Sequence, residues 1–326
     1  MPRNSIGFGA LALAGLALAA LSPALPAHAQ GAALQSASAP EPGDKAETQS
    51  IPAAAPGQAP EGSVGGMGDI NLYPKRVVMT DRDRTASIGL YNRAAATGDY
   101  EITLTDMMMT PEGQLINLAS VTDPAQIAKV HTASSLLRWS PRRVTLPANE
   151  AQMVRIMSHV PPGLPPGEYR AHFTVVSVPQ DAGDMSIEQA VGAGDKGLGV
   201  RIVPRFGISI PVILRLGETT LNVGLEGLAV TGAPGAAPAF RLQIKRSGTR
   251  SAFGDLVIAA PGVKTPVGIL RGVGVYTEID GRTVQIPIDP KADPRTYAKG
   301  ARLTVTYTDD DFAPGKVLAR QDFIVP

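Results

Sequence analysis

Cysteine is absent from all 326 residues of this chain. A chain without thiols has no disulfide, no zinc–thiolate site and no cysteine nucleophile, so three common classes of site are excluded at once. An oxidising compartment permits disulfides but does not require them when a domain buries a large enough core. The missing cysteine therefore limits the chemistry of the protein and leaves its compartment open.

Aromatic residues and blocks of one charge are also scarce. Phe, Trp and Tyr make up 5% of the sequence, and 30 Lys and Arg against 29 Asp and Glu leave a formal net charge of +1. A nucleic-acid partner is not expected, because phosphate binding depends on a concentrated basic surface. By contrast, the chain contains 35 Gly and 29 Pro, a composition that favours many turns and short strands over helices.

The only long apolar stretch lies at the N-terminus. It follows Arg3, runs from Ile6 to Leu21, and is succeeded by the small-residue sequence Ala27-His28-Ala29. A basic start, a short apolar core and an A-x-A site are typical of a secretory signal peptide, whereas a membrane-spanning helix needs about 20 consecutive apolar residues. We therefore predict a signal peptide at residues 1–29, cleaved after Ala29, and an exported protein that does not span the membrane.

The remaining sequence divides by composition into three parts. Residues 30–66 are almost entirely Ala, Pro, Gly, Ser, Gln and Glu, and so few large apolar side chains cannot offset the entropy of ordering the chain, which predicts a disordered leader. Short alternating apolar runs follow, with about seven or eight candidate strands in residues 67–216 and seven more in residues 217–326. This pattern predicts an all-β protein with two tandem immunoglobulin-like β-sandwich domains.

Neither predicted domain contains a motif for catalysis or metal binding. The mature chain has three histidines, His131, His159 and His172, and their spacing does not place two imidazoles on one metal. The acidic run Asp309-Asp310-Asp311 lacks the spaced ligands of a calcium loop, so we expect a solvated hairpin turn. Three successive methionines, Met107–Met109, point to alternate faces of a strand, and we expect ordinary core and edge packing. The sequence therefore predicts a protein that is not an enzyme and has no cofactor.

The segment from Val200 to Leu214 is the longest β-like run of the chain. A long strand behind a Gly-rich loop can pair with another chain by β-augmentation, in which alternate side chains fill pockets of the partner. The same alternation fits a buried last strand of the sandwich, and the pattern leaves both interpretations open. The apolar candidates for donation are Val200, Ile202, Phe206, Ile208 and Ile210.

Several short motifs, in order along the chain, resemble the PapD-like periplasmic chaperones of pilus assembly. Leu72–Met79 resembles their opening strand, Leu137–Pro141 their x-x-S-P element, Gln152–Ile156 their Q-x-V-R-[IL] strand and Leu164–Arg170 the turn into their F strand, after which a G strand follows. The resemblance covers essentially residues 70–326. It implies two immunoglobulin-like sandwiches joined in an L-shaped arrangement, and a periplasmic chaperone that stabilises pilus or fimbrial subunits by donor-strand complementation with its G strand.

The resemblance also implies how a subunit is held. In the family, a basic pair anchors the terminal carboxylate of the subunit, as charge-assisted hydrogen bonds would. The Arg of this pair maps onto Arg76. The second member is a Lys late in the G strand, but this sequence has Gly207 or Ser209 there, and Arg205 is the nearest basic candidate. The implied partners are a pilus or fimbrial subunit and an outer-membrane usher.

Two other classes of protein fit the same strands. A pilus or surface-fibre subunit would donate an N-terminal extension of alternating bulky apolar residues, but residues 30–66 offer only Leu34, Ile51 and Val64. A periplasmic ligand-binding β-sandwich protein is compatible with the fold, since fold does not determine function. The scarcity of aromatics and the lack of a ligand cluster in the sequence speak against it.

Overall fold

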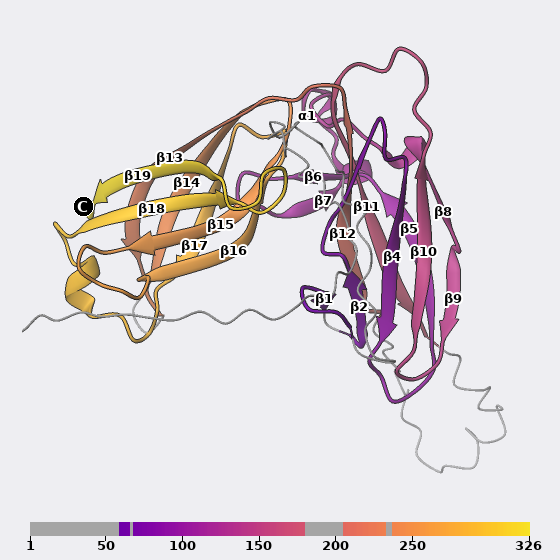
Figure 1. Ribbon diagram of the computed structural model, residues 1–326, viewed down its shortest axis with the longest axis horizontal. Coiled ribbons are helices and arrows are strands. Elements are labelled where there is room, and N and C mark those ends of the chain that lie inside the picture. Colours follow the sequence, from indigo (N-terminus) through magenta and orange to yellow (C-terminus); the bar gives the residue numbers. More distant parts are fainter. Residues whose placement is uncertain (1–58, 66–67, 180–204, 233–236) are drawn as a thin grey trace, which may run out of the picture. The chain divides into compact units, whose positions relative to one another are not determined.

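The computed structural model describes residues 59–65, 68–179, 205–232 and 237–326 (Figure 1). The predicted signal peptide, most of the predicted leader, and the donor-strand candidates Val200 and Ile202 lie outside the described residues. Strands dominate the described residues, in which the helices are one four-residue α-helix and three short 3-10 helices. The protein is all-β, as the sequence predicts.

The first β-sandwich ends at residue 216 and consists of two five-stranded sheets. Their strand orders are β1-β2-β4-β10-β8 and β3-β12-β11-β5-β9. The strands are β1 Val64–Gly65, β2 Ile70–Tyr73, β3 Val77–Thr80, β4 Thr85–Asn92, β5 Gly98–Thr105, β8 Leu137–Ser140, β9 Arg143–Leu146, β10 Ala151–Ser158, β11 Gly167–Val178 and β12 Gly207–Leu216.

Alternation along the strands builds the core of this sandwich. In β10, Val154 and Ile156 are fully buried, whereas Met153, Arg155 and Met157 are exposed. Successive side chains of a strand point to opposite faces, so one face of each sheet is apolar and packs against the other sheet. Burial of one large apolar side chain contributes about 1.5–3 kcal/mol, and the core contains a continuous set of them, including Phe173 of β11.

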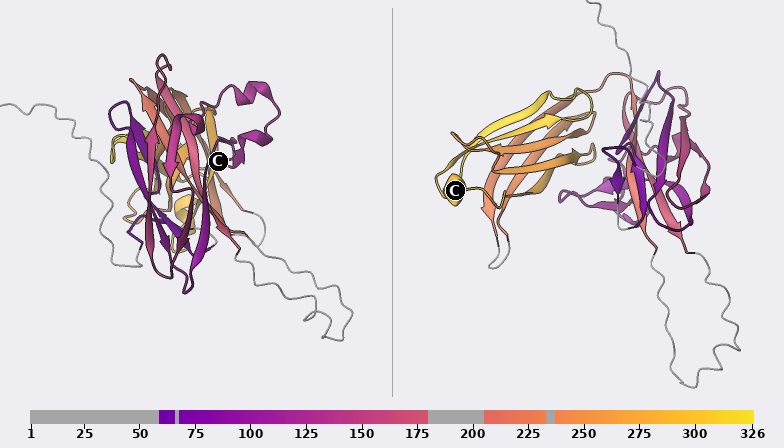
Figure 2. Two further views of the ribbon diagram at one scale, coloured as in Figure 1. Left: turned by 90° about the vertical axis from the view of Figure 1, so that its right-hand side faces the viewer. Right: turned by 60° about the horizontal axis from the view of Figure 1, so that its bottom comes forward.

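The chain leaves the first sandwich between β5 and β8 and forms a small excursion (Figure 2). Its elements are the hairpin of β6 Met107–Met109 and β7 Leu115–Asn117, η1 Leu118–Ser120, α1 Pro124–Ile127 and η2 Ser134–Leu136. Met108 and Met109 are buried, which confirms the expected packing of the methionines. The Met109 N–H donates to Glu278 of the second sandwich (2.8 Å), and Thr283 N–H donates to the Pro111 carbonyl (2.8 Å).

The second β-sandwich follows a short connection after β12. Its sheets have the orders β13-β14-β17 and β16-β15-β18-β19, and its core includes Phe240, Leu256 and Tyr307. The Tyr307 hydroxyl donates to the Val273 carbonyl (2.8 Å), so the buried polar end of this ring is paired. The elements are β13 Leu221–Thr231, β14 Ala239–Gly248, β15 Ala252–Ala259, β16 Gly268–Val275, β17 Gly281–Pro287, η3 Pro294–Tyr297, β18 Arg302–Asp309 and β19 Val317–Ile324.

Two residues of the predicted leader, which was expected to extend to residue 66, form a strand. Strand β1 pairs antiparallel with β2, with Val64 opposite Leu72 and Gly65 opposite Asn71. A strand of two residues that includes a glycine has no apolar alternation for a pattern to detect. The sequence alone therefore does not predict this hairpin, and it is recognised in the structure from the pairing of β1 with β2.

Candidate functional site

Strand β12 has different neighbours along its two halves. On one side it pairs antiparallel with β11 over its whole length, with Gly207 opposite Val176 and Leu216 opposite Gly167. On the other side β3 pairs with it in parallel, and only over residues 212–215. In the described part of the chain, no strand pairs with this side from residue 207 to residue 211. This open edge, residues 207–211 of β12, is about 17 Å long at 3.3 Å per residue.

The main-chain groups that face the open edge follow from the ladder with β11. Ser177 N–H donates to the Phe206 carbonyl (2.8 Å), so these two residues form a hydrogen-bonded pair. In an antiparallel ladder such pairs alternate with pairs whose main-chain groups point away. Gly207, Ser209 and Pro211 therefore direct their main-chain groups toward the open edge. Proline has no N–H, and the parallel register of Val77 with Val212 sets the Pro211 carbonyl opposite the first N–H of β3. The open edge therefore offers two donors and two carbonyl acceptors, at Gly207 and Ser209.

The structure separates the predicted donor side chains into two groups. Ile208 and Ile210 are 6% and 1% exposed and belong to the core of the first sandwich. Their assignment as donated residues is corrected, because a side chain that fills its own core cannot also fill a groove of a partner. Phe206, immediately before β12, is 41% exposed and accessible.

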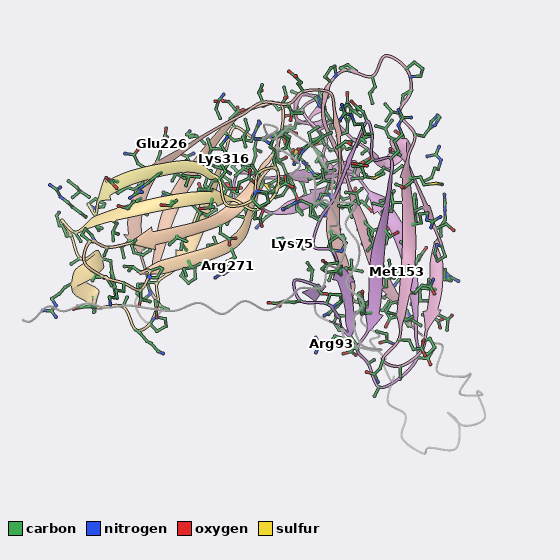
Figure 3. All side chains as sticks on the ribbon, in the orientation of Figure 1. Lys75, Arg93, Met153, Glu226, Arg271 and Lys316 are labelled. Carbon is green, nitrogen blue, oxygen red and sulfur yellow. The ribbon has the colours of Figure 1, made fainter. Side chains whose placement is uncertain are left out.

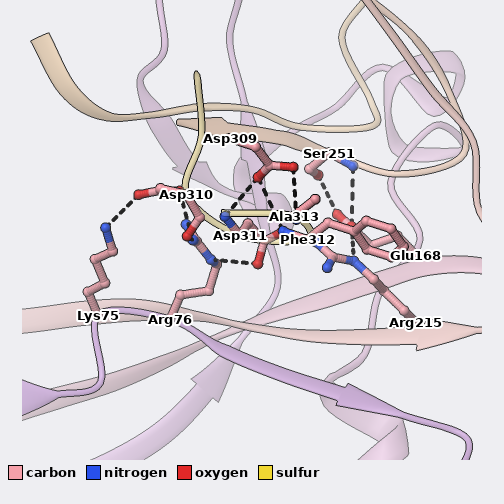
Figure 4. Close-up of polar contacts among 10 residues, drawn as sticks. All are labelled: Lys75, Arg76, Glu168, Arg215, Ser251, Asp309, Asp310, Asp311, Phe312 and Ala313. Atoms are coloured by element: carbon pink, nitrogen blue, oxygen red, sulfur yellow. Dashed lines mark hydrogen bonds and ion pairs between the residues drawn. The ribbon is translucent and has the colours of Figure 1, made fainter. Parts of the chain in front are cut away.

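Arg76 lies between β2 and β3 and is 9% exposed. Its Nη2 donates to Asp310 Oδ1 (2.9 Å) and to the Asp310 carbonyl (3.1 Å), and its Nε is 3.2 Å from Asp311 Oδ1 (Figure 4). The guanidinium also lies over the ring of Phe253, 4.1 Å from its centroid. The predicted anchor cation is therefore already paired with two carboxylates of the second sandwich.

Lys75, beside Arg76, completes a basic pair at the edge of this cluster. Its side chain is 47% exposed, and Nζ donates to Asp310 Oδ2 (2.5 Å). Burial opposes ionisation of Asp310, but the hydrogen bonds from Lys75 and Arg76 and their charges outweigh it and hold the pKa of Asp310 below its usual range. Asp310 is therefore a carboxylate held by two cations, one buried and one accessible.

Arg205 is not brought to Arg76. The parallel register sets Val77 beside Val212, so Arg76 lies beside residue 211. Arg205 precedes that position by six residues, about 20 Å of extended chain. Its side chain is exposed and lies near the Ser177 carbonyl and Glu101 (3.3 and 3.5 Å). The basic partner of Arg76 at this place is Lys75, its neighbour in sequence.

A buried ionic network adjoins this basic pair, and the sequence analysis missed it. Arg215 of β12 donates through Nε to Glu168 Oε2 (3.0 Å) and through Nη2 to Asp311 Oδ2. Glu168 also accepts from the N–H (3.2 Å) and the hydroxyl of Ser251. Burial lowers the pKa of Arg215, but the charges of Glu168 and Asp311 more than offset it and raise the pKa above its usual value. Glu168, Arg215 and Asp311 thus join the two sandwiches (Figure 4).

The acidic run lies at the hairpin connection between β18 and β19, as predicted, but it is not solvated, so that part of the prediction is wrong. Asp309 is 4% exposed, and its carboxylate accepts from the N–H groups of Asp311 (2.8 Å), Phe312 (3.2 Å) and Ala313 (3.1 Å). The first aspartate therefore holds the shape of the loop, and the next two bind cations of the first sandwich. A run of three acids predicts a solvated segment when no cation is near in the sequence. The cations that bind Asp310 and Asp311 lie more than 90 residues away.

A second buried ion pair lies on the same face of β11. Arg170 binds Glu278 through both terminal nitrogens (2.7 and 3.1 Å) and lies over the ring of Tyr276, 3.6 Å from its centroid. His172, two residues along, is 1% exposed, and its Nε2 is 3.5 Å from the Tyr276 hydroxyl. Glu168, Arg170 and His172 occupy alternate positions of β11 and therefore lie on one face of it. This run of polar residues on a strand is the signal in the sequence that could have indicated the interface with the second sandwich.

Acidification is expected to weaken the fold through His172. Burial, and then the charge of Arg170, lower its pKa to about 3. The unfolded chain binds this proton near pH 6.5, so stability is unaffected above that pH and falls as the pH drops from about 6.5 toward 3. The contribution is about 2 kcal/mol of unfolding free energy between pH 7.5 and 5. Urea unfolding of the wild type and of His172→Gln at both pH values measures it.

The control for this prediction is His159→Gln, which alters an exposed imidazole. The His172→Gln variant should lose about 2 kcal/mol less than the wild type on acidification, and His159→Gln should behave as the wild type. Equal pH dependence in all three proteins would show that His172 is not held neutral.

Comparison with known proteins gives similarity to solved structures only. No protein-family model matches the chain, and no curated protein sequence matches it. The YadV chaperone is 13% identical, with a TM-score of 0.39, and the match covers 78% of this chain and 100% of that one. The CupB2 chaperone of Pseudomonas aeruginosa is 11% identical, with a TM-score of 0.40 and coverage of 78% and 100%. A structure of Salmonella enterica SafA pilin with the SafB chaperone is 11% identical, with a TM-score of 0.39, and the match covers 80% of this chain and 99% of that one.

The described ranges, residues 59–65, 68–179, 205–232 and 237–326, contain only short helices. No helix there is long and apolar enough to cross a membrane. No group of three or more His, Asp or Glu residues is arranged there to hold a metal ion. Two features of the described residues suggest binding, namely the open edge of β12 and the basic pair Lys75–Arg76.

Proposed function

We propose that this protein is a periplasmic chaperone, exported by the signal peptide at residues 1–29, that binds an incomplete β-sandwich subunit of a pilus or fimbria. The subunit adds a strand to the open edge of β12 and is then delivered for assembly, with an outer-membrane usher as the receiving partner. The observation that carries this proposal is the open edge itself, which ends beside the basic pair Lys75–Arg76.

The position of β3 suggests how the bound strand would end. Because β3 runs parallel to β12 and begins at Val77, a strand added in parallel to the open edge lies in line with β3 and ahead of it. Such a strand reaches its C-terminus near residue 211, next to Lys75 and Arg76. A terminal carboxylate at this point can accept charge-assisted hydrogen bonds from a basic pair. The geometry therefore fits a subunit whose last strand ends the chain.

Main-chain and side-chain contacts would contribute differently to binding. The N–H and C=O groups of the open edge supply affinity without regard to the sequence of the bound strand. The exposed ring of Phe206, at the start of the edge, can enter a pocket of the partner. A sandwich that lacks a strand exposes both an edge and an apolar groove, so covering both prevents aggregation.

The alternative of a pilus subunit finds less support. A subunit of that kind lacks the last strand of its own sandwich and receives it from a partner. In this chain β12 pairs with β11 in the first sandwich, and β19 pairs with β18 in the second. Each sandwich thus includes its own last strand.

Co-expression tests the proposal directly. A β-sandwich subunit encoded by a neighbouring gene is expressed with and without this protein, and the soluble, affinity-purified fraction is compared. We expect the subunit to be recovered only when this protein is present. Equal recovery of a folded, soluble subunit without it would contradict the proposed function.

Replacing Phe206 with aspartate should lower the amount of subunit that is captured by about tenfold, because a charge cannot enter an apolar pocket without losing its hydration. The matched control is Met153→Asp on β10 (Figure 3), since both side chains are 41% exposed in the free protein. Thermal unfolding of both variants checks that the fold is retained. Equal capture by the Phe206→Asp variant and the wild type would exclude this side chain from the binding surface.

A further inference from the structure

The two oxygens of the Asp310 carboxylate are divided between the two cations of the basic pair. Oδ2 accepts from Lys75 Nζ at 2.5 Å, and Oδ1 accepts from Arg76 Nη2 at 2.9 Å. This is the arrangement that a terminal carboxylate needs when two cations bind it. In the free protein, the place of an external carboxylate is thus filled by a carboxylate of the same chain.

The loop around Asp310 is fixed on both sides of this residue. The Asp309 carboxylate holds three successive N–H groups, and Asp311 is bound by Arg215 and Arg76. The main chain of Asp310 is also bonded, because its N–H donates to the Phe253 carbonyl (3.2 Å) and its carbonyl accepts from Arg76 (3.1 Å). Only the Asp310 side chain can leave without rearrangement of the loop.

The exposure of these groups indicates from which side an exchange can occur. The side chain of Asp310 is 18% exposed and that of Lys75 is 47% exposed, whereas that of Asp311 is 7% exposed. An incoming carboxylate can therefore meet Lys75 first and displace Asp310 from the accessible side. Arg76 keeps Asp311 throughout, so the buried guanidinium is never left without an anion, which would be costly.

We propose that Asp310 is an internal competitor at the basic pair Lys75–Arg76: it occupies the place of an incoming carboxylate in the free protein, and the C-terminal carboxylate of a bound strand must displace it. The identity of the incoming group rests on the proposed function, because the open edge directs the end of an added strand to this pair. Asp310 then acts as an internal competitor that lowers affinity for strands without a terminal carboxylate at this position. The site selects strands that end the chain.

The first experiment tests the site without a strand. Thermal unfolding of the wild type, Asp310→Asn and Asp322→Asn is measured at neutral pH in equal concentrations of sodium acetate and sodium chloride. We expect Asp310→Asn to unfold roughly 2–5 °C below the wild type in chloride and to recover at least half of this loss in acetate. Asp322→Asn, which removes an exposed charge from the same sandwich, should respond to neither. Equal Tm values of Asp310→Asn in the two salts would overturn the proposal.

The second experiment uses an N-acetylated peptide of alternating valine and threonine, made with a free C-terminal carboxylate or with a C-terminal amide. Asp310→Asn is expected to bind the carboxylate form about tenfold more tightly than the wild type does, and the amide form equally. A gain that is the same for both forms, or no gain for either, would contradict the competition.

A milder variant keeps the test independent of the stability of Asp310→Asn. Lys75→Gln removes the half-exposed cation and leaves the contact of Arg76 with Asp310 intact. It should weaken binding of the carboxylate peptide about fivefold and leave the amide peptide unchanged, and an equal loss for both would count against the site. If neither peptide binds any variant, the proposed function is contradicted, whereas the acetate comparison still decides whether Asp310 occupies a carboxylate site.

Discussion

Replacing Arg215 with methionine is expected to lower the free energy of unfolding by about 3–5 kcal/mol, the usual cost of removing one partner from a buried ion pair. Arg215 is bound on both sides, to Glu168 and to Asp311, and the side chains of all three are at most 7% exposed. Methionine fills much of the same volume but leaves two carboxylates without their shared cation. Their hydration cannot be restored while the two sandwiches stay in contact, so the penalty falls on the folded state.

Urea unfolding followed by the fluorescence of Trp139, the single tryptophan, and by far-UV circular dichroism measures this loss. The two signals also show whether the two sandwiches unfold together, since a two-domain chain need not unfold in one step. Arg205→Met is the matched control, because it makes the same substitution at a side chain that is 51% exposed and 3.5 Å from Glu101. Exposed pairs contribute about 0–1 kcal/mol. Similar losses in the two variants would show that the buried network does not join the sandwiches.

Ser209→Pro is expected to reduce capture of a subunit strand by about tenfold to a hundredfold. The N–H of Ser209 faces the open edge, and proline removes this donor. A carbonyl of the bound strand is then left without a hydrogen bond, at a cost of about 1–3 kcal/mol. The ladder with β11 does not use this N–H, and proline is tolerated at an edge position of that kind. Pro211 occupies the equivalent position two residues later. Stability should therefore change much less than binding.

Ser209→Ala is the control, because both substitutions remove the hydroxyl that lies 3.0 Å from Thr174 Oγ1, and only proline removes the N–H. The yield of co-purified subunit and the dissociation constant of the valine–threonine peptide are measured for both variants. Alanine should leave both quantities close to those of the wild type. Equal capture by the two variants would show that the partner does not pair with the open edge.

The sequence by itself determined the strand content and the two-sandwich architecture of this protein. Segments such as β10 alternate between apolar and polar side chains, and this period of two predicts a strand with one buried face. The period can be recognised from neighbouring residues alone, so it needs no knowledge of the tertiary structure. Turn residues bound the strands for the same local reason. Packing of the methionines at 107–109 was also predicted, since methionine is apolar and adapts to irregular gaps, but only the structure shows that Met108 and Met109 are the buried ones.

Tertiary structure alone decided which surface covers each face and each edge. Ile208 and Ile210 had to be apolar in either interpretation of β12, and only the opposing sheet shows that they fill their own core. Among the described residues, β3 pairs only with residues 212–215 of β12 and leaves residues 207–211 open, and β3 lies some 130 residues earlier in the chain.

The ionic cluster shows the same limit most clearly. Arg170 meets Glu278 across 108 residues, and Arg76 meets Asp310 across 234. The alternation of polar and apolar residues along a strand is the same whether an acidic side chain faces water or a buried arginine. The pattern therefore shows that the position is polar but does not identify its neighbour. The sequence could therefore indicate Arg76 as a functional cation, but the carboxylate that occupies it, and hence the competition that we propose, required the contact between the two sandwiches.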